Sequence, residues 1–368
     1  MSSRSLRPLV RKLGLAGVSA ALVAGLSAAA VPQPPRPSAA STGDPALVAR
    51  LRDATADLPG QGFAAAVGDA TGSTSAAVGT ADVDRPLEAG TPQEIGSITK
   101  SLTGLLLADM VARGEVTPAT TLGQVHPDLR GELATTTLDE LATHTSGLPR
   151  LSTRAAAAGL LASFTLGNPY RFDTPDNLLR DAAWTPFRTE RGRYAYSNLG
   201  YALLGNALAQ RAGLPYPQLL AERVLTPLGL DATVAAPPAP PAGAARQLGP
   251  DGRVAEPWLS AGSTPAGTGV WSTAEDLGRL ARAAATGGLD PLALRPRVQD
   301  GESGVGWGWF TVDLDGRTLL YNNGATSGVQ ASVWAEPATG AWAVVTSPSG
   351  SEAVDTQTVA LRLLGLAS

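Results

Sequence analysis

Hydrophobic and polar positions follow two different patterns along the chain, and together they predict an α+β fold. Residues 63–67 and 73–78 are short runs of small and apolar residues joined by a glycine-containing turn, which is typical of a β-hairpin. The middle of the chain, from about 100 to 285, has mostly helical spacing and long turns. Beyond it, four short segments predict consecutive antiparallel strands at residues 307–313, 317–322, 329–336 and 342–347.

Three helices frame these segments. Asp44 and Pro45 predict a helix that runs to about Leu58, with the aspartate as N-cap and the proline at the first helical position. Leucines at helical spacing predict a second helix over residues 98–112, and residues 351–366 are predicted to close the chain as a third.

Strands at both ends of a helical middle predict one antiparallel sheet that is flanked by helices and completed by distant parts of the chain. The sheet part is expected at about 44–100 and 286–368, and an inserted, mostly α-helical lobe at about 101–285. Residues 44–368 then form one domain, with a ligand cleft where the sheet and the lobe meet.

The N-terminal segment predicts export. Residues 1–30 have a basic start, an apolar run rich in Ala, Gly and Leu, and a small-residue end, as in a signal peptide. An uncleaved membrane anchor is the alternative, because the apolar run is near the lower limit for spanning a bilayer. Residues 31–43, rich in Pro, Ser and Ala, are expected to be a disordered leader. We therefore expect the domain to work outside the cytoplasmic membrane.

Composition narrows the chemistry. The formal net charge is -4 and no basic run follows the N-terminus, so nucleic acid is not an expected partner. The chain has no cysteine and only two histidines, His126 and His144, which disfavours disulfides and a catalytic zinc. His144 lies in a Thr/Ser/Gly-rich loop and is expected to be structural.

Lysine usage points to a nucleophile. Of the 28 lysines and arginines only Lys12 and Lys100 are lysines, and Lys100 follows Ser97 by three positions. A lysine amine can lose its proton when buried, whereas arginine cannot. Ser-x-x-Lys is a spacing at which such an amine activates a serine hydroxyl at the start of a helix. The alternative is a serine N-cap followed by an exposed lysine.

A second motif contains a tyrosine and an asparagine. Tyr196 could act as a general base or acid if a nearby lysine stabilised its phenolate. Asn198 could hold the lysine or a substrate amide. The alternative is an aromatic cluster at a helix start, with Ser197 or Asn198 as its cap.

Taken in order, these motifs resemble the serine β-lactamase-related family, in the branch of class C β-lactamases, D,D-peptidases and esterases. The resemblance rests on Ser97-Ile98-Thr99-Lys100, Tyr196-Ser197-Asn198, and the framework segments 141–149, 227–230, 269–277 and 306–309, and it covers roughly residues 45–365. It implies a sheet sandwiched with helices, a helical lobe, and an acyl-enzyme mechanism without a metal or an organic cofactor.

The family's third motif, Lys-Thr-Gly or His-x-Gly on a strand, is altered. Asn322 stands at the Lys or His position and Gly324 matches the glycine. The resemblance implies that the backbone N–H groups of Ala325 and Ser97 form the oxyanion hole, which the change spares. Because Asn322 removes a charge-assisted contact to a substrate carboxylate, esters and amides without a carboxylate should suffer less. An ordinary hairpin turn is the alternative for this segment.

We therefore expect an exported serine hydrolase that forms an acyl-enzyme on an ester or amide. Ser97 would be the nucleophile, with Lys100 and Tyr196 sharing the proton transfers. A D-alanyl-D-alanine carboxypeptidase or β-lactamase acting on cell-wall peptides or penicillins is one alternative. A cell-surface binding pseudoenzyme is the other. The sequence predicts no oligomeric state.

Overall fold

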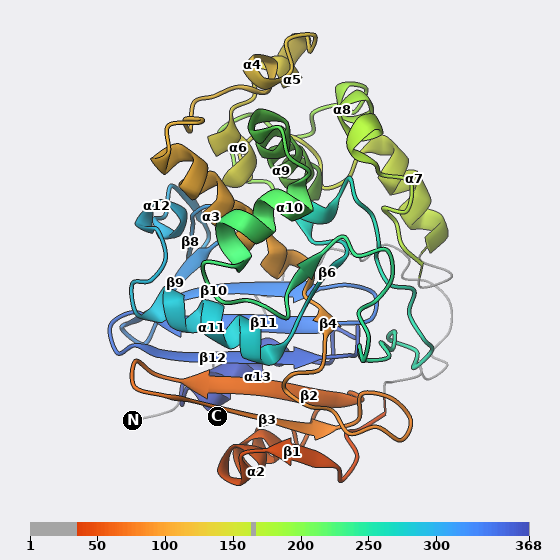
Figure 1. The fold of residues 1–368 in the computed structure, drawn as a ribbon, viewed down its shortest axis with the longest axis vertical. Helices are drawn as coiled ribbons and strands as arrows, with labels where there is room; N and C mark the ends of the chain where they lie inside the picture. The colour runs from red at the N-terminus through yellow and green to blue at the C-terminus, as the bar shows by residue number, and fades with distance from the viewer. Residues whose placement is uncertain (1–34, 163–166, 368) are drawn as a thin grey trace.

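The computed structural model describes residues 35–162 and 167–367, and in them nine strands form one sheet (Figure 1). The strand order is β1-β3-β2-β12-β11-β10-β9-β8-β7, and every neighbouring pair is antiparallel. The strands are β1 (Ser41–Gly43), β2 (Gly62–Gly68), β3 (Ser73–Gly79), β7 (Val298–Asp300), β8 (Ser303–Val305), β9 (Phe310–Leu314), β10 (Arg317–Ala325), β11 (Gln330–Glu336) and β12 (Ala341–Ser347). Since β2 pairs with β12, distant parts of the chain complete the sheet, as predicted.

Both faces of the central part of the sheet are buried, because alternate residues of the central strands enter two separate cores. In β2, Phe63, Ala65 and Val67 enter one core, whereas Ala64 and Ala66 enter the other. The first core is closed by α2 (Pro45–Ala54) and α13 (Thr356–Leu363). The second is closed by α11 (Ala274–Ala285) and by the helical lobe.

The lobe lies over one end of the sheet (Figure 1). A small sheet of β4 (Gln93–Glu94), β6 (Val270–Ser272) and β5 (Val234–Ala235) joins the two parts, and Gly96–Ile98 form a 3₁₀ turn before α3. The remaining helices are α3 (Thr99–Ala112), α4 (Leu122–Val125), α5 (Gly131–Thr135), α6 (Leu138–Ala142), α7 (Thr153–Ala162), α8 (Pro175–Ala183), α9 (Asn198–Ala212), α10 (Tyr216–Leu220), continued by a π-helical turn at Ala221–Leu225, a 3₁₀ turn at Thr264–Ala266, and α12 (Pro291–Leu294).

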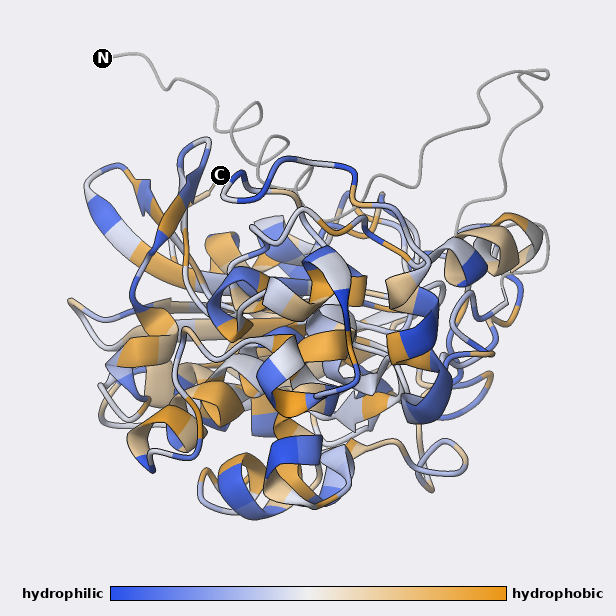
Figure 2. Cartoon of the chain, turned by 90° about the horizontal axis from the view of Figure 1, so that it is seen from above, coloured by the Kyte–Doolittle hydropathy of each residue, from blue (hydrophilic) through white to orange (hydrophobic). Residues whose placement is uncertain are grey.

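Several expected elements are confirmed. Asp44 caps α2 by accepting a hydrogen bond from the Leu47 N–H (2.8 Å), and Pro45 is the first helical residue. The hairpin of β2 and β3 forms with the predicted strands. Figure 2 shows that the helices carry both hydrophobic and hydrophilic residues, as expected for helices that bury one face.

Two domain boundaries need correction. Residues 41–43, expected in the disordered leader, form β1 and pair with β3, because an edge strand there supplies hydrogen bonds to residues 76–78. Helix α11, expected in the lobe, packs on β2, β11 and β12, because its small residue Gly278 fits against Trp342. The lobe therefore ends before residue 274.

Four predicted elements have different bounds. The helix expected to run from Asp44 to about Leu58 ends at Ala54, where Thr55 caps it. The strand expected from residue 307 begins at Phe310, because Gly306 and Trp309 close a tight turn (N–H to carbonyl, 2.8 Å). The strand expected at 317–322 continues to Ala325, because its last residues still pair with β11. The helix expected over 351–366 begins only at Thr356, where Asp355 caps it.

The predicted signal, residues 1–30, lies outside the described residues. In the part of the chain that the structure describes, no helix has the length and apolar character needed to cross a membrane.

Candidate active site

Ser97 and Lys100 lie at the junction of the sheet and the lobe. Ser97 is in the 3₁₀ turn that leads into α3, and Lys100 is in the first turn of that helix. This spacing places both side chains on one face. The Lys100 Nζ donates a hydrogen bond to the Ser97 Oγ over 2.9 Å. The two residues that the sequence paired are therefore in direct contact.

The Lys100 side chain is held in a buried position. It is 1 % exposed, and its Nζ also donates to the Ala266 carbonyl over 2.5 Å. Burial disfavours the charged ammonium and lowers the pKa of Lys100, and the Arg150 guanidinium acts in the same direction against the opposing effect of Tyr196. A lowered pKa makes the neutral amine, which can accept a proton, more accessible.

Tyr196 reaches the same oxygen from the start of α9. Its hydroxyl donates to the Ser97 Oγ over 2.7 Å, so the serine oxygen contacts both partners. Burial alone would raise the pKa of Tyr196, but the charges of Lys100 and Arg150 and the hydrogen bonds with Lys100 and Ser97 outweigh it and leave the pKa below its ordinary value. Ser97, Lys100 and Tyr196 thus form one hydrogen-bonded cluster.

His144 fixes the segment that carries Tyr196. Its Nδ1 accepts a hydrogen bond from the Ser197 N–H (3.0 Å), its carbonyl accepts from Ala195 N–H (2.8 Å), and its ring lies 4.4 Å from that of Tyr196. Its φ of 60° is the left-handed conformation, which the surrounding contacts must stabilise. Burial lowers the pKa of His144 well below its ordinary value. These contacts agree with the expected structural role.

Asn198 lies beside the cluster, bound to a residue that the sequence did not single out. Its Nδ2 donates to the Tyr170 hydroxyl over 2.6 Å. Its Oδ1 is buried and, among the described residues, has no hydrogen-bond partner. That oxygen is an acceptor available to a donor entering the site.

Strand β10 passes directly beside the nucleophile. A β-carbon at Gly324 would lie 1.9 Å from the Ile95 carbonyl oxygen, so only glycine permits this approach. A β-carbon at Gly96 would lie 2.6 Å from the backbone nitrogen of Ala325. The backbone of Ala325 is therefore adjacent to the turn that contains Ser97.

Asn322 is buried beneath the helix start. It is 3 % exposed, and its Nδ2 donates to the Ser101 Oγ (2.9 Å) and to the Gly308 carbonyl (2.6 Å). The Ser101 hydroxyl donates to the same carbonyl. The Asn322 amide thus links β10, α3 and the turn before β9.

The structure adds three groups that sequence reasoning missed. Arg150, whose guanidinium carbon lies 5.1 Å from the centre of the Tyr196 ring, directly follows the recognisable segment 141–149. Its position directly after that segment was the one available signal. Tyr170 and the Ala266 carbonyl carried no signal, because only the folded loops bring them to Asn198 and Lys100.

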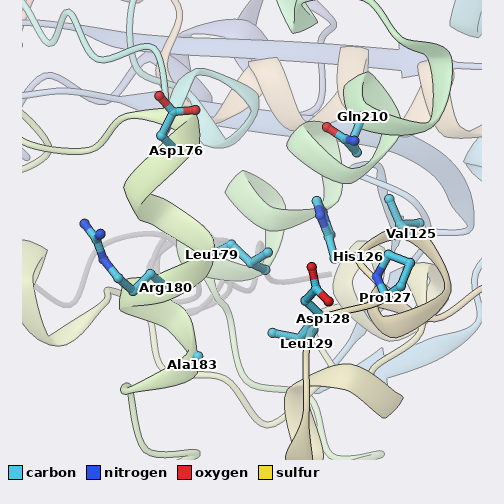
Figure 3. A pocket seen from close by; sticks show the side chains of 10 residues that line it. All are labelled: Val125, His126, Pro127, Asp128, Leu129, Asp176, Leu179, Arg180, Ala183 and Gln210. Atoms are coloured by element: carbon cyan, nitrogen blue, oxygen red, sulfur yellow. The ribbon is translucent and has the colours of Figure 1, made fainter.

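Other features of the described residues lie apart from this cluster. Within the described ranges, no group of three or more His, Cys, Asp or Glu side chains is arranged to hold a metal ion. A surface depression of the lobe, shown in Figure 3, contains none of the cluster residues. It is lined by Val125, His126, Pro127, Asp128, Leu129, Asp176, Leu179, Arg180, Ala183 and Gln210.

Comparisons with known proteins agree with the geometry. The family model described as Beta-lactamase matches residues 47–366. The chain is 33% identical over 155 residues to the D-alanyl-D-alanine-carboxypeptidase/endopeptidase AmpH of Escherichia coli (strain K12), covering 39% of this chain and 36% of that protein. It is 31% identical over 151 residues to a Beta-lactamase of Providencia stuartii, covering 40% and 35%. A Beta-lactamase of Escherichia coli (strain K12) is 28% identical over 265 residues, covering 64% and 62%. The matched regions thus span between about a third and three fifths of these relatives.

Proposed function

We propose that this chain, which belongs to the beta-lactamase family, is an exported serine hydrolase that forms an acyl-enzyme at Ser97 on an ester or amide. Membership of this family supports a serine hydrolase in general. The particular substrate, the roles of the site residues and the export are our proposals.

The reaction would begin with Ser97. Its hydroxyl gives its proton to a neutral Lys100 amine or to a Tyr196 phenolate while Oγ bonds to the carbonyl carbon. The carbonyl oxygen takes up the negative charge, and the backbone N–H groups of Ser97 and Ala325 stabilise it. The bond to the leaving group then breaks, and the leaving group takes the proton from the same pair. A water molecule, deprotonated in turn, attacks the acyl-enzyme and releases the acid.

The observation that carries this proposal is the contact of one serine oxygen with two proton-transfer groups. The Ser97 Oγ lies 2.9 Å from the Lys100 Nζ and 2.7 Å from the Tyr196 hydroxyl oxygen. The lowered pKa values of Lys100, through burial, and of Tyr196, through neighbouring cations that outweigh burial, support a shared base. The buried Oδ1 of Asn198 would accept a hydrogen bond from a substrate N–H or from the lysine.

The environment of Asn322 supports a substrate without a carboxylate at that position. Its amide nitrogen donates to Ser101, to the Gly308 carbonyl and, at 3.4 Å, to the Ser97 carbonyl, so it would act as a structural link. The names of the relatives favour the second candidate, a D-alanyl-D-alanine carboxypeptidase or a β-lactamase. In that case, a cell-wall peptide or penicillin would be the substrate.

Covalent labelling tests the proposal. The protein is incubated with a fluorophosphonate and, separately, with a fluorescent penicillin, and the adduct is located by mass spectrometry. We expect one adduct, on Ser97, and none in the Ser97→Ala variant. If neither reagent labelled the protein, a binding pseudoenzyme would be the better interpretation. Hydrolysis of a short-chain nitrophenyl ester compared with that of a chromogenic cephalosporin then separates the two enzyme candidates.

A further inference from the structure

The backbone of Arg150 is hydrogen-bonded to the start of α9, next to Tyr196. Its backbone carbonyl accepts hydrogen bonds from the N–H groups of Asn198 and Leu199, both over 3.1 Å. These N–H groups belong to the first turn of α9, which directly follows Tyr196 and Ser197. The position of residue 150 relative to the tyrosine is therefore set by the backbone and does not depend on the side chain.

The Arg150 side chain places a permanent charge against the tyrosine. Its guanidinium carbon lies 5.1 Å from the centre of the Tyr196 ring, within the range of a cation–π contact. The Lys100 Nζ lies 4.9 Å from the same ring centre. The two cations differ in kind, because lysine can lose its proton in a buried site and arginine cannot.

That difference affects how many protons Lys100 and Tyr196 hold between them. Lys100 and Tyr196 share the Ser97 oxygen, so their protonation states are coupled. When the lysine gives up its proton, its charge no longer stabilises a phenolate, whereas the charge of Arg150 remains. The guanidinium lowers the pKa of Lys100 in addition to the larger effect of burial. It lowers the pKa of Tyr196 together with Lys100, against the opposing effect of burial.

On the basis of the proposed function, we propose that Arg150 is a positioning residue for acylation. Its permanent charge favours the state of the Lys100–Tyr196 pair that has one proton fewer. In this state either the Lys100 amine is neutral or the Tyr196 hydroxyl is ionised, and either group can accept the Ser97 proton. The proposal therefore does not depend on which of the two is the base.

Among the described residues, the other ionisable groups that face the tyrosine are a histidine and three phenols, and none of these supplies a permanent positive charge. His144 packs on the ring and burial disfavours its cationic form. The remaining neighbours that interact with Tyr196 are phenols, from the loop before α8, from the segment before α9 and from α9 itself: Tyr170, Tyr194 and Tyr201.

The test compares Arg150→Gln with Arg150→Lys. The glutamine variant keeps the backbone contacts of residue 150 and loses the charge, and the lysine variant keeps the charge. Arg193→Gln is the matched control, since it removes an exposed arginine three residues before the tyrosine. Thermal melting establishes that each variant is folded.

We expect the acid limb of the pH profile of kcat/KM to move to higher pH in Arg150→Gln. At neutral pH kcat/KM should fall about 10-fold, the size of effect that one nearby charge produces, and should recover as the pH is raised. Arg150→Lys should retain most of the wild-type profile, and Arg193→Gln should keep the position of the acid limb. A profile of Arg150→Gln with an unmoved acid limb would overturn the proposal.

A second readout separates this proposal from the proposed function. Phenolate absorbance near 295 nm is titrated in Lys100→Met and in the double variant Lys100→Met/Arg150→Gln, so that the lysine does not titrate. Each is compared with the same protein carrying Tyr196→Phe, so that the difference reports Tyr196 alone. We expect the Tyr196 signal to appear at higher pH without Arg150. This holds even if no ester is hydrolysed, so failure of the hydrolase assignment and failure of the Arg150 proposal give different results.

Discussion

Glu94 gives a prediction whose magnitude follows directly from the structure. It lies three residues before the nucleophile, is 1 % exposed, and accepts hydrogen bonds from the Trp258 N–H (2.8 Å) and the Thr326 hydroxyl (3.2 Å). With its amide nitrogen turned towards the carboxylate, Gln247 donates a third bond over 2.9 Å. Burial nevertheless outweighs these donors and raises the pKa of Glu94 from 4.5 to about 7.

The sign and size of the effect of Glu94 on the free energy of unfolding follow from proton linkage. The folded protein holds this proton more tightly than the unfolded chain, so between about pH 4.5 and 7 the folded state binds more protons. The free energy of unfolding therefore falls as pH rises through this window. Below the window Glu94 contributes no pH dependence, and above it the loss is complete and no longer changes with pH. A rise of this size corresponds to a loss of about 3 kcal/mol across the window.

Glu94→Gln should remove this loss. The glutamine amide does not titrate, and the Gln247 amide can turn to present either end to it. Urea unfolding at pH 4.5 and pH 8, followed by tryptophan fluorescence, measures the free energy of both proteins. We expect the variant to gain about 3 kcal/mol relative to the wild type between the two pH values. Glu88→Gln, which removes an exposed carboxylate from the same stretch, controls for the change in net charge. Equal pH slopes for wild type and Glu94→Gln would refute the reasoning.

Three further predictions concern the site itself. Lys100→Arg should reduce acylation about 10³-fold or more, to the level of the alanine variant of the nucleophile, because a guanidinium cannot accept the proton; near-normal turnover in a steady-state assay would exclude the amine from the mechanism. Gly324→Ala should lower the melting temperature and abolish labelling, since its β-carbon would lie 1.9 Å from the Ile95 carbonyl oxygen, whereas Gly72→Ala, which meets no atom within 4 Å, should change neither. Asn322→Ala should cost about 1–3 kcal/mol in urea unfolding through its lost buried hydrogen bonds; an unchanged free energy of unfolding would count against its structural role.

The sequence predicted the parts of this molecule that depend on local patterns. The helix cap at Asp44, the antiparallel strands and the one-turn spacing of Ser97 and Lys100 are all short-range features, and the structure has them. The contact with Tyr196 came from a resemblance, since nothing local relates residues so far apart. Arg150 was missed because its relation to the tyrosine depends on the fold of a loop.

The same limit explains the misplaced boundaries. Helix α11 was assigned to the lobe because it follows a long helical region, and its amphipathic pattern does not say which surface it covers. In the structure its buried face, which includes Leu277, Leu280 and Gly278, packs on the sheet. Residues 41–43 are rich in small polar groups, and their pairing with β3 depends on an open edge that composition does not reveal.

The pairing of β2 with β12 sets the order of events during synthesis. The innermost strand contributed by the first hundred residues finds its neighbour only after residues 341–347 have left the ribosome. Until then one edge of the β2–β3 hairpin has no partner strand. Ser97 likewise lacks β10, the strand that lies beside it in the folded protein. A nascent chain of this protein would therefore have neither a complete sheet nor a complete site until it is nearly full length.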